Sequence, residues 1–354
     1  MYNDQLGQFA EYLCNLLGYD KFLPSSSGVE ACESACKVAR RWGYEVKNVR
    51  DNEAQIVMAR NNFWGRSITA SGACDDPSRF KHFGPFTPGF PLVPYGDIQA
   101  LENYLKFDQN VVAVMFEPIQ GEGGIIIPPE GYFKQVKQVC QKYNVLMIAD
   151  EVQTGFGRTG VLMGSQHDMK DCKPDIMTVA KSVSGGVTPV SGIVCDNHIM
   201  EVITPGTHGS TYGGNPLGMA VAKRAVEVLV EEKMVENSKE MGEYLIERMR
   251  QLKSPLIKEV RGRGLFVGLE FKRGLKISAN DIANNLLNHG LITKATHEMT
   301  LRMSPPLTVN KKQIDEGLEI LKQAIGELET LSKERMSTSS ASTSSSTSRT
   351  FSLP

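Results

Sequence analysis

The chain has 354 residues and a mass of 39.0 kDa, which is enough for two domains with sizeable cores. It holds 39 basic and 40 acidic residues, and the formal net charge of -1 gives no general attraction to nucleic acid or to an anionic membrane. No apolar run approaches the ~20 residues that a membrane-spanning helix needs. We therefore expect neither nucleic acid nor a membrane as a partner, and any specificity must come from a local site.

The N-terminal sequence MYNDQLGQFAEYL lacks the basic and apolar regions of a secretory signal and the Arg-rich character of a mitochondrial presequence. This predicts a cytoplasmic location for the chain as given, with the mitochondrial matrix as the alternative for a longer form. The seven cysteines are scattered and include no C-x-x-C, which is typical of free thiols in a reducing compartment. The six histidines show no metal-ligand spacing, so we do not expect a metal enzyme.

Short apolar runs alternate with amphipathic segments over the first two thirds of the chain. Continuous apolar runs, typical of strands covered on both faces, lie at 55–60, 111–118, 145–151, 176–182 and 192–196. Between them, residues 29–42 and 131–143 carry apolar side chains at helical spacing. This alternation predicts an α/β fold built on a largely parallel sheet flanked by helices.

The pattern changes after Pro216. Predicted elements beyond it are a helix-rich stretch at 217–253, strands at 264–271 and 300–303, and an amphipathic helix near 311–333. We therefore predict a boundary close to Pro216, where a new unit begins.

Three regions follow from this division. We predict a large domain over 1–216 and a smaller α+β domain over 217–333. The remaining residues, 334–354, are rich in Ser and Thr, and they cannot bury enough apolar surface to offset the entropy lost on ordering. We therefore expect them to be disordered.

Charged side chains end three of the predicted strands. Glu117, Asp150 and Lys181 each follow an apolar run, and Gly-rich turns come after Asp150 and Lys181. In open parallel sheets ligands collect at the carboxyl ends of the strands. About one crossover unit separates Asp150 from Lys181, so we expect them on neighbouring or near-neighbouring strands. The sequence thus predicts that these three side chains converge at one edge of the sheet.

The segment SSSGVEACESACK at 25–37 is a predicted helix start. Its serines and glycine precede apolar positions at helical spacing, and the free N–H groups and dipole of such a start favour an anion such as phosphate. A serine in this position is more often only a helix cap. The phosphate hypothesis gains weight because an Asp and a Lys stand at nearby strand ends.

A cofactor that has a phosphate, a pyridine nitrogen and an aldehyde fits all three features. Pyridoxal phosphate needs a lysine for its Schiff base and a carboxylate that keeps the ring nitrogen protonated, so that the ring can draw electrons from a substrate carbanion. Asp150 would then pair with the pyridinium. Lys181 would carry the Schiff base and, once displaced by substrate, would act as general base.

The sequence IADEVQTGFGRTG followed by VAKSVSGG closely resembles the cofactor signature of the class III, fold-type I aminotransferases. Further motifs occur in the family's order over about residues 2–330, namely GVEACE, NNFWGR, FEPIQGEGG, HGSTYGGNPLG and LRMSPPL. These motifs are most similar to those of the family members that act on ornithine. The resemblance implies a large domain with a mostly parallel sheet and a smaller α+β C-terminal domain.

The resemblance also implies roles for residues around the cofactor. Ser27, Gly28 and Val29 would hold the phosphate, Phe63 would stack on the pyridine face, and Gln153 would accompany the ring hydroxyl. Ser210 and Thr211 would reach the phosphate bound by a neighbouring subunit. The expected assembly is therefore a homodimer or a higher homo-oligomer.

Substrate contacts are implied in the same way. Arg302 resembles the arginine that receives the α-carboxylate of glutamate or 2-oxoglutarate, and Glu122 resembles the carboxylate that occupies it while ornithine is bound. Arg66 resembles a second carboxylate-binding arginine, for ornithine. An arginine with a removable Glu partner lets one site accept two different substrates by exchange of ion pairs.

Two alternatives stay open. Another class III activity, on acetylornithine or 4-aminobutyrate, is possible, although the Arg302 and Glu122 pair and NFWGR argue against it. A non-catalytic homologue is the second, because family members carry a long N-terminal segment ahead of the position where this chain begins. We accordingly expect dimer assembly and substrate recognition to suffer, and the chain as given to be a poor or inactive enzyme.

Overall fold

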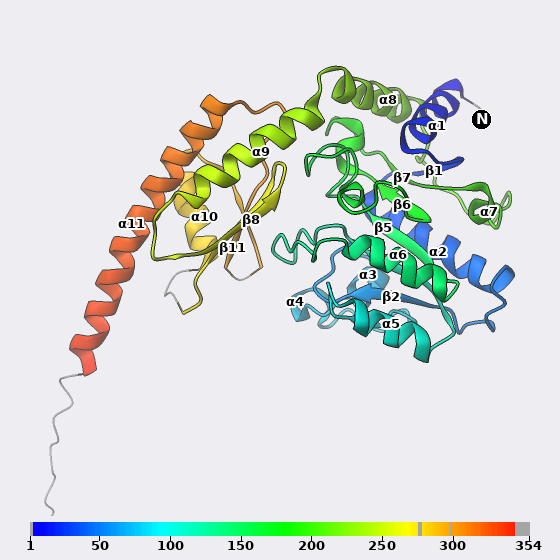
Figure 1. Ribbon diagram of the computed structural model, residues 1–354, viewed down its shortest axis with the longest axis horizontal. Coiled ribbons are helices and arrows are strands. Elements are labelled where there is room, and N and C mark those ends of the chain that lie inside the picture. The colour runs from blue at the N-terminus through cyan, green and yellow to red at the C-terminus, as the bar shows by residue number, and fades with distance from the viewer. Residues whose placement is uncertain (1–2, 275–277, 298, 344–354) are drawn as a thin grey trace, which may run out of the picture.

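The computed structural model describes residues 3–274, 278–297 and 299–343, with side chains described as far as residue 330. The described chain forms two units, each with its own sheet (Figure 1). The larger sheet has seven strands in the order β1-β7-β6-β5-β4-β2-β3. Its strands are β1 (Lys21–Ser25), β2 (Gln55–Ala59), β3 (Leu92–Val93), β4 (Val111–Phe116), β5 (Leu146–Asp150), β6 (Ile176–Val179) and β7 (Ser191–Cys195).

Strands β2 to β6 run parallel, β7 runs antiparallel to β6, and the edge strand β1 pairs antiparallel with β7. The prediction of a largely parallel sheet is therefore confirmed. Strand β1 was not predicted, since its sequence KFLPS contains Pro24. A proline fits there because β1 lies at the edge of the sheet, where a missing N–H breaks no central ladder.

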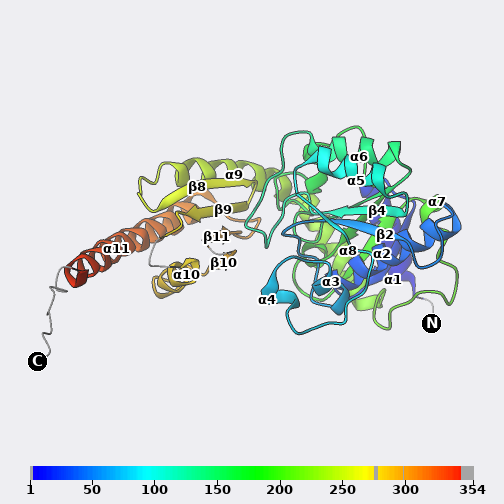
Figure 2. The same ribbon diagram turned by 90° about the horizontal axis from the view of Figure 1, so that it is seen from below.

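Helices cover both faces of the large sheet. Figure 2 shows α5 and α6 on one side of the strands and α2 on the other. The helices of this unit before α8 (Pro216–Glu231) are α1 (Asp4–Leu17), α2 (Gly28–Glu45), α3 (Ile68–Gly72), α4 (Pro77–Phe80), α5 (Ile98–Phe107), α6 (Tyr132–Lys142) and α7 (Asn197–Met200), with short 3-10 turns η1 (Gly164–His167) and η2 (Lys181–Ser184). Alternate residues of one strand enter different cores: Ile148 of β5 packs with α2, whereas Met147 and Ala149 pack with α5 and α6. This double burial explains the continuous apolar runs.

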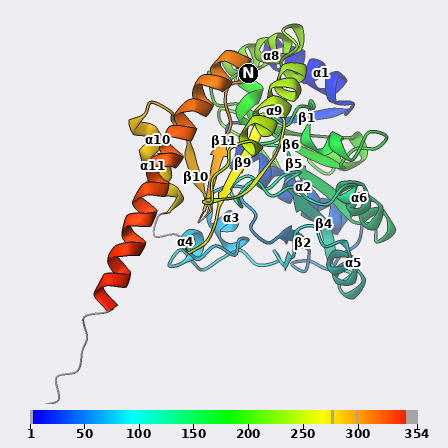
Figure 3. The same cartoon turned by 60° about the vertical axis from the view of Figure 1, so that its left-hand side comes forward.

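The second unit is an antiparallel sheet in the order β10-β11-β9-β8, packed with helices. Its elements are α9 (Met234–Arg250), β8 (Ile257–Arg263), β9 (Phe266–Phe271), α10 (Ala279–Asn288), β10 (Lys294–Thr296), β11 (Thr300–Met303) and α11 (Lys311–Thr343). Figures 1 and 3 show the C-terminal end of α11 extending beyond the rest of the molecule.

Helix α11 continues further than the sequence predicted. It runs to Thr343 and so enters the segment 334–354 for which the composition predicts disorder. Once a helix is nucleated, each added residue gains one backbone hydrogen bond, and a packed first part can carry a polar extension. The prediction for 344–354 lies outside the described residues.

Helix α8 (Pro216–Glu231) belongs by its packing to the large unit. Its buried residues Met219, Ala222 and Val226 share a core with Phe9 and Leu13 of α1. The change of pattern at Pro216 coincides with the start of this helix. We propose that the division falls between α8 and α9, because the core of the small unit begins on α9.

Two arginine side chains connect the units, one extending from each unit to the other. Arg158, in the Gly-rich loop after β5, donates to the carbonyl oxygens of Leu265 and Pro305 at 3.0 and 2.7 Å. Arg261 of β8 donates from Nη2 to the carbonyl of Gly124 at 2.6 Å and from Nε to that of Ile125 at 3.0 Å. These bonds attach the small sheet to loops at the carboxyl edge of the large one. Within the described part of the chain, none of the helices has the length and apolar character to cross a membrane.

Candidate active site

The three charged residues at the strand ends converge, as the sequence predicted. Glu117 follows β4, Asp150 ends β5 and Lys181 opens η2 directly after β6, so all three reach the same edge of the parallel sheet. They line one cavity of about 240 Å³. The other residues around this cavity are Gly28, Val29, Phe63, Trp64, Gly65, Arg66, Val152 and Gln153.

Asp150 is buried, with 3% of its surface exposed. Its Oδ1 atom accepts hydrogen bonds from the Val152 N–H at 3.1 Å and the Thr178 hydroxyl at 2.9 Å. Its Oδ2 atom has only a weak contact from the Cys32 thiol, at 3.6 Å. Burial raises the pKa of Asp150, and the neutral donors and the Lys181 charge oppose that rise. A buried carboxylate with one oxygen so weakly satisfied suits a cationic group in the cavity.

Lys181 lines the cavity, and the residue as a whole is exposed. Its backbone has a left-handed φ of 46°, a conformation that costs a non-glycine residue about 1 kcal/mol and that clusters at functional sites. Desolvation by the surrounding protein lowers the pKa of Lys181, while Asp150 and Glu117 oppose the change. A lysine with a lowered pKa offers more of the neutral, nucleophilic amine at a given pH.

Glu117 joins two loops of the site. Its carboxylate accepts the N–H of Phe63 at 3.1 Å and the N–H of Gly121 at 3.0 Å. Burial, followed by the charge of Asp150, raises the pKa of Glu117 to about 8. The sequence predicted its position but no role. The structure shows that it holds the loop of Phe63 to the loop that carries Glu122.

The helix start predicted to favour an anion is present at the N-terminus of α2. Ser27 is its N-cap, and the side chain of Glu30 accepts the N–H groups of Ser26 and Ser27 at 3.1 and 2.7 Å and the Ser27 hydroxyl at 2.8 Å. Ser27 is thus a helix cap, as the more common interpretation predicted. The N–H and hydroxyl donors around it already bond to a carboxylate oxygen. Gly28 packs closely against Val152, since a Cβ at position 28 would lie 2.9 Å from Val152 Cγ1.

Of the predicted substrate residues, Arg66 lines the cavity, while Glu122 and Arg302 pair beside it and reach it through Gln153. Arg302 Nη1 lies 2.6 Å from Glu122 Oε1 and 3.2 Å from Gln153 Oε1. Burial acts to raise the pKa of Glu122, but Arg302 and then Lys294 outweigh it and hold that pKa below its ordinary value. Arg66 lies beside the ring of Phe63, with 5.7 Å from its guanidinium carbon to the ring centre.

Two predicted residues do not reach this cavity within the chain. Ser210 and Thr211 lie in the loop between α7 and α8, where Thr211 is exposed and the Ser210 hydroxyl accepts the Gly213 N–H at 3.0 Å. Nothing in the described chain places them next to Lys181. Their predicted role toward a neighbouring subunit stays a prediction.

Three further residues at the site were missed by sequence reasoning. Thr178 and Cys32 contact the Asp150 carboxylate, and Lys294 contacts Glu122 at 3.2 and 3.4 Å. Thr178 could have been found only from the register of β5 and β6, in which it lies opposite Asp150. Among the described residues, no group of three or more His, Cys, Asp or Glu side chains is placed to hold a metal ion.

Residues 1–325 match the family model of the class III aminotransferases. The chain belongs to the class III aminotransferase family. Class III aminotransferases use pyridoxal 5'-phosphate, and this chain is accordingly a pyridoxal-phosphate-dependent aminotransferase. The matched region contains both sheets and every predicted site residue.

Relatives of this aminotransferase carry more specific names. The chain is 50% identical over 320 residues to a probable mitochondrial ornithine aminotransferase of Caenorhabditis elegans, covering 90% of this chain and 75% of that protein. A structure of the ornithine aminotransferase of Toxoplasma gondii, with pyridoxal phosphate at partial occupancy, has a TM-score of 0.91 at 40% identity and covers 94% of this chain and 79% of its own. An acetylornithine aminotransferase structure from Elizabethkingia anophelis has a TM-score of 0.82 at 40% identity, covering 92% and 79%.

Proposed function

We propose that the chain transfers the δ-amino group of ornithine to 2-oxoglutarate, giving glutamate 5-semialdehyde, which cyclises to pyrroline-5-carboxylate, and glutamate. The observation that carries the proposal is the ion pair of Arg302 and Glu122, 2.6 Å apart, beside the cavity that holds Lys181 and Asp150. A carboxylate that covers an arginine lets the site take a substrate by its terminal amine. The names of the relatives from Caenorhabditis elegans and Toxoplasma gondii support the same activity.

The residues present fit the cofactor. Asp150 would hold the protonated ring nitrogen, Lys181 would bind the aldehyde, and Phe63 would cover the ring. Gln153 would contact the ring hydroxyl, while Ser27, Gly28 and Val29 would hold the phosphate at the start of α2, where the Glu30 carboxylate would give up the Ser27 donors that it now accepts. Pyridoxal phosphate, when bound, supplies an aldehyde that takes up the amino group and a ring that accepts electron density from the substrate carbon.

Lys181 does the proton transfer in this proposal. Its Nζ, with a lowered pKa, is available as a neutral base to take the proton from the substrate carbon that bears the amine. Asp150 remains ionised opposite a cation, because the charge pair removes the cost that burial otherwise imposes. Glu117 keeps the Phe63 loop in place through its hydrogen bond to the Phe63 N–H.

Two arginines divide the recognition of substrate carboxylates. Arg66 would bind the α-carboxylate of ornithine, while Glu122 occupies Arg302 and keeps it from attracting that group. In the second half of the reaction, Glu122 would leave, and Arg302 would receive the α-carboxylate of 2-oxoglutarate or glutamate.

We further propose that the working assembly is a homodimer. The loop with Ser210 and Thr211 carries the large exposed apolar side chain of Tyr212, and Leu217 at the start of α8 is exposed as well. Exposed apolar groups gathered beside one loop are typical of a protein interface. A second copy bound there would let Ser210 and Thr211 reach the phosphate of its neighbour. Sedimentation of the purified chain tests this, and a monomer at assay concentrations would contradict it.

Acetylornithine is the second candidate donor, because the acetylornithine aminotransferase structure from Elizabethkingia anophelis is also 40% identical. The decisive experiment compares three donors with 2-oxoglutarate, namely ornithine, N-acetylornithine and 4-aminobutyrate, at equal concentrations. We expect glutamate to form fastest with ornithine, together with pyrroline-5-carboxylate, which o-aminobenzaldehyde detects. Faster reaction with N-acetylornithine would replace the proposal by the acetylornithine activity.

A further inference from the structure

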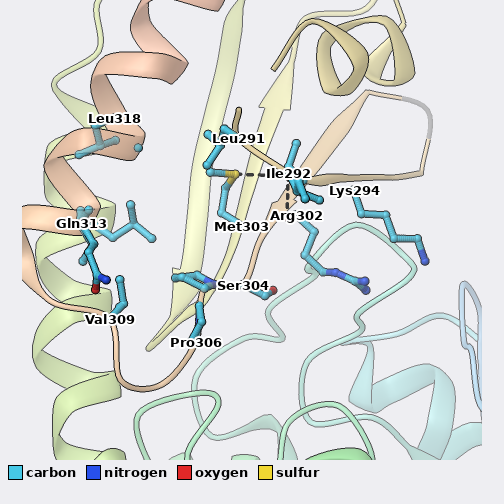
Figure 4. Close-up of a pocket in the computed structure, with 15 residues that line it drawn as sticks. Leu291, Ile292, Lys294, Arg302, Met303, Ser304, Pro306, Val309, Gln313 and Leu318 are labelled. Carbon is cyan, nitrogen blue, oxygen red and sulfur yellow. Dashed lines mark hydrogen bonds between the residues drawn. The ribbon is translucent and has the colours of Figure 1, made fainter. Parts of the chain in front are cut away.

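Two cationic side chains face each other at the edge of the small sheet. Lys294 of β10 and Arg302 of β11 are register partners in the antiparallel pair. Figure 4 shows both side chains extending in the same direction, away from Leu291, Val309 and Leu318, which line the same pocket. Like charges directly opposite each other in a sheet are destabilising. Something must therefore compensate this pair.

Glu122 is the compensating group. Its Oε1 lies 2.6 Å from Arg302 Nη1, and its Oε2 and Oε1 lie 3.2 and 3.4 Å from Lys294 Nζ. The side chains of Arg302 and Glu122 are 18% and 16% exposed, whereas that of Lys294 is 58% exposed. One carboxylate thus bridges a half-buried and a solvent-facing cation.

The backbone beside Glu122 is attached to the same strand that carries Lys294. The Thr296 hydroxyl donates to the carbonyl of Glu122 at 3.0 Å, and that of Gly121 lies 3.4 Å from it. Thr296 is buried in β10. Movement of the Glu122 carboxylate is therefore a rotation of its side chain over a fixed backbone, within reach of the long, flexible stem of Lys294.

We propose that Lys294 is a positioning residue for Glu122 in the exchange of ion pairs at Arg302, which we call the Glu122 gate. When Arg302 binds the carboxylate of 2-oxoglutarate or glutamate, Lys294 keeps the Glu122 carboxylate in place. The proposal rests on the proposed function. In the closed arrangement Glu122 has both cations, and Arg302 gives the closer contact. In the open arrangement Arg302 is taken by substrate, and Lys294 is the cation that stays in contact with Glu122. Loss of Lys294 therefore penalises the open arrangement more than the closed one.

The test compares the two half-reactions in a Lys294→Met variant by stopped-flow absorbance of the cofactor. We expect the apparent affinity for 2-oxoglutarate to fall roughly threefold to fivefold, the effect of one exposed ion pair. The affinity for ornithine should change much less. Lys294→Arg should restore the 2-oxoglutarate affinity, and Lys258→Met, which removes a similarly exposed lysine paired with Glu270 on the same sheet, is the matched control. Equal losses in both half-reactions would overturn the proposal.

A second readout does not depend on turnover. Glutarate is a dicarboxylate without an amino or keto group, so its binding can be measured by calorimetry on the loaded protein. We expect Lys294→Met to weaken glutarate binding by the same factor in the native background and to have no effect when Glu122→Ala is already present, because Lys294 acts through Glu122. A persisting effect in the Glu122→Ala background would show that Lys294 binds the ligand itself and would overturn the proposal.

The two hypotheses fail in different ways. If the native protein does not transaminate ornithine, the proposed function falls, while the glutarate measurements still decide the role of Lys294. If ornithine reacts and the Lys294→Met effect is absent from both readouts, the role of Lys294 falls and the proposed function stands.

Discussion

Asp150 and Thr178 lie opposite each other on the neighbouring parallel strands β5 and β6, and the Thr178 hydroxyl donates a 2.9 Å hydrogen bond to the Asp150 carboxylate. Both residues are buried. The second acceptor bond of the same oxygen comes from the Val152 N–H. The sheet itself thus orients the carboxylate, and its less satisfied oxygen is left for the cofactor.

Thr178→Val keeps the shape of the side chain and removes the donor. The pKa of Asp150 should rise further, since one of the bonds that favour its ionised form is lost. We expect cofactor affinity and turnover each to fall by roughly tenfold, the worth of a hydrogen bond to a charged group. Thr178→Ser retains the hydroxyl and should keep most of the cofactor affinity and most of the turnover. Fluorescence titration with pyridoxal phosphate and steady-state kinetics check this, and a Val variant equal to the Ser variant would contradict it.

Lys181 should be the residue that binds the cofactor aldehyde. Borohydride reduction of the loaded protein followed by peptide mapping should place the pyridoxyl group on Lys181. Lys181→Ala should still bind the cofactor through the other contacts and lose transamination by several orders of magnitude. A label on Lys173 or on another lysine would refute the assignment.

Asp150→Asn tests the charge at the cofactor ring. The amide keeps the size of the side chain but cannot stabilise a protonated nitrogen, so turnover should collapse while the circular dichroism spectrum stays native. Asp175→Asn, directly before β6 and paired with Lys137, is a control in which stability should suffer and the chemistry should not. Near-native turnover of Asp150→Asn would show that another group holds the nitrogen.

The gate predicts unequal damage from Arg302→Lys. A lysine keeps the charge but loses the planar, two-pronged contact with a carboxylate. We expect the 2-oxoglutarate half-reaction to slow much more than the ornithine half-reaction, which uses Arg66. Single-turnover measurements of each half-reaction decide it, because equal losses are incompatible with the exchange of ion pairs.

Acid should destabilise the protein through His167. Burial lowers the pKa of His167 to about 4, and its Nε2 lies 3.1 Å from the Thr159 carbonyl oxygen. The His167 side chain takes up a proton near pH 6.5 in the unfolded chain and only near pH 4 in the folded chain. The contribution of neutral His167 to the free energy of unfolding is therefore complete above pH 6.5 and is lost as the pH falls toward 4. His167→Gln should flatten the fall in unfolding free energy over this window, measured by urea denaturation. The exposed His198→Gln is the control, and an unchanged slope in His167→Gln would contradict the assignment.

The central strands and the meeting of Asp150 with Lys181 were predictable from sequence. Strands buried on both faces leave continuous apolar runs, and parallel strands end at one edge, so residues at their ends must converge. The contact of Thr178 with Asp150 was not predictable, because it depends on the register of two strands. Lys294 was missed for the same reason: its contact depends on which residue of β11 it faces.

Other elements were not predicted correctly because their sequences are ambiguous on their own. Strand β8 reads IKEVRGR, with little apolar character, and it forms because it pairs with β9 at the edge of the small sheet. Helix α8 was assigned to the small unit from the pattern after Pro216. Its partner, α1, lies more than two hundred residues earlier, and local periodicity does not reveal which distant surface covers a helix.

The reciprocal arginines bear on how far the protein can be treated as two modules. Arg158 depends on acceptors at Leu265 and Pro305, and Arg261 depends on acceptors at Gly124 and Ile125. Cutting the chain between the units would leave each part with an arginine that has lost its carbonyl acceptors and with carbonyls that have lost their donor. A chimaera that takes its small unit from another family member would have to import the matching loops of the large one. We therefore expect the two sheets to be exchangeable only as a single piece.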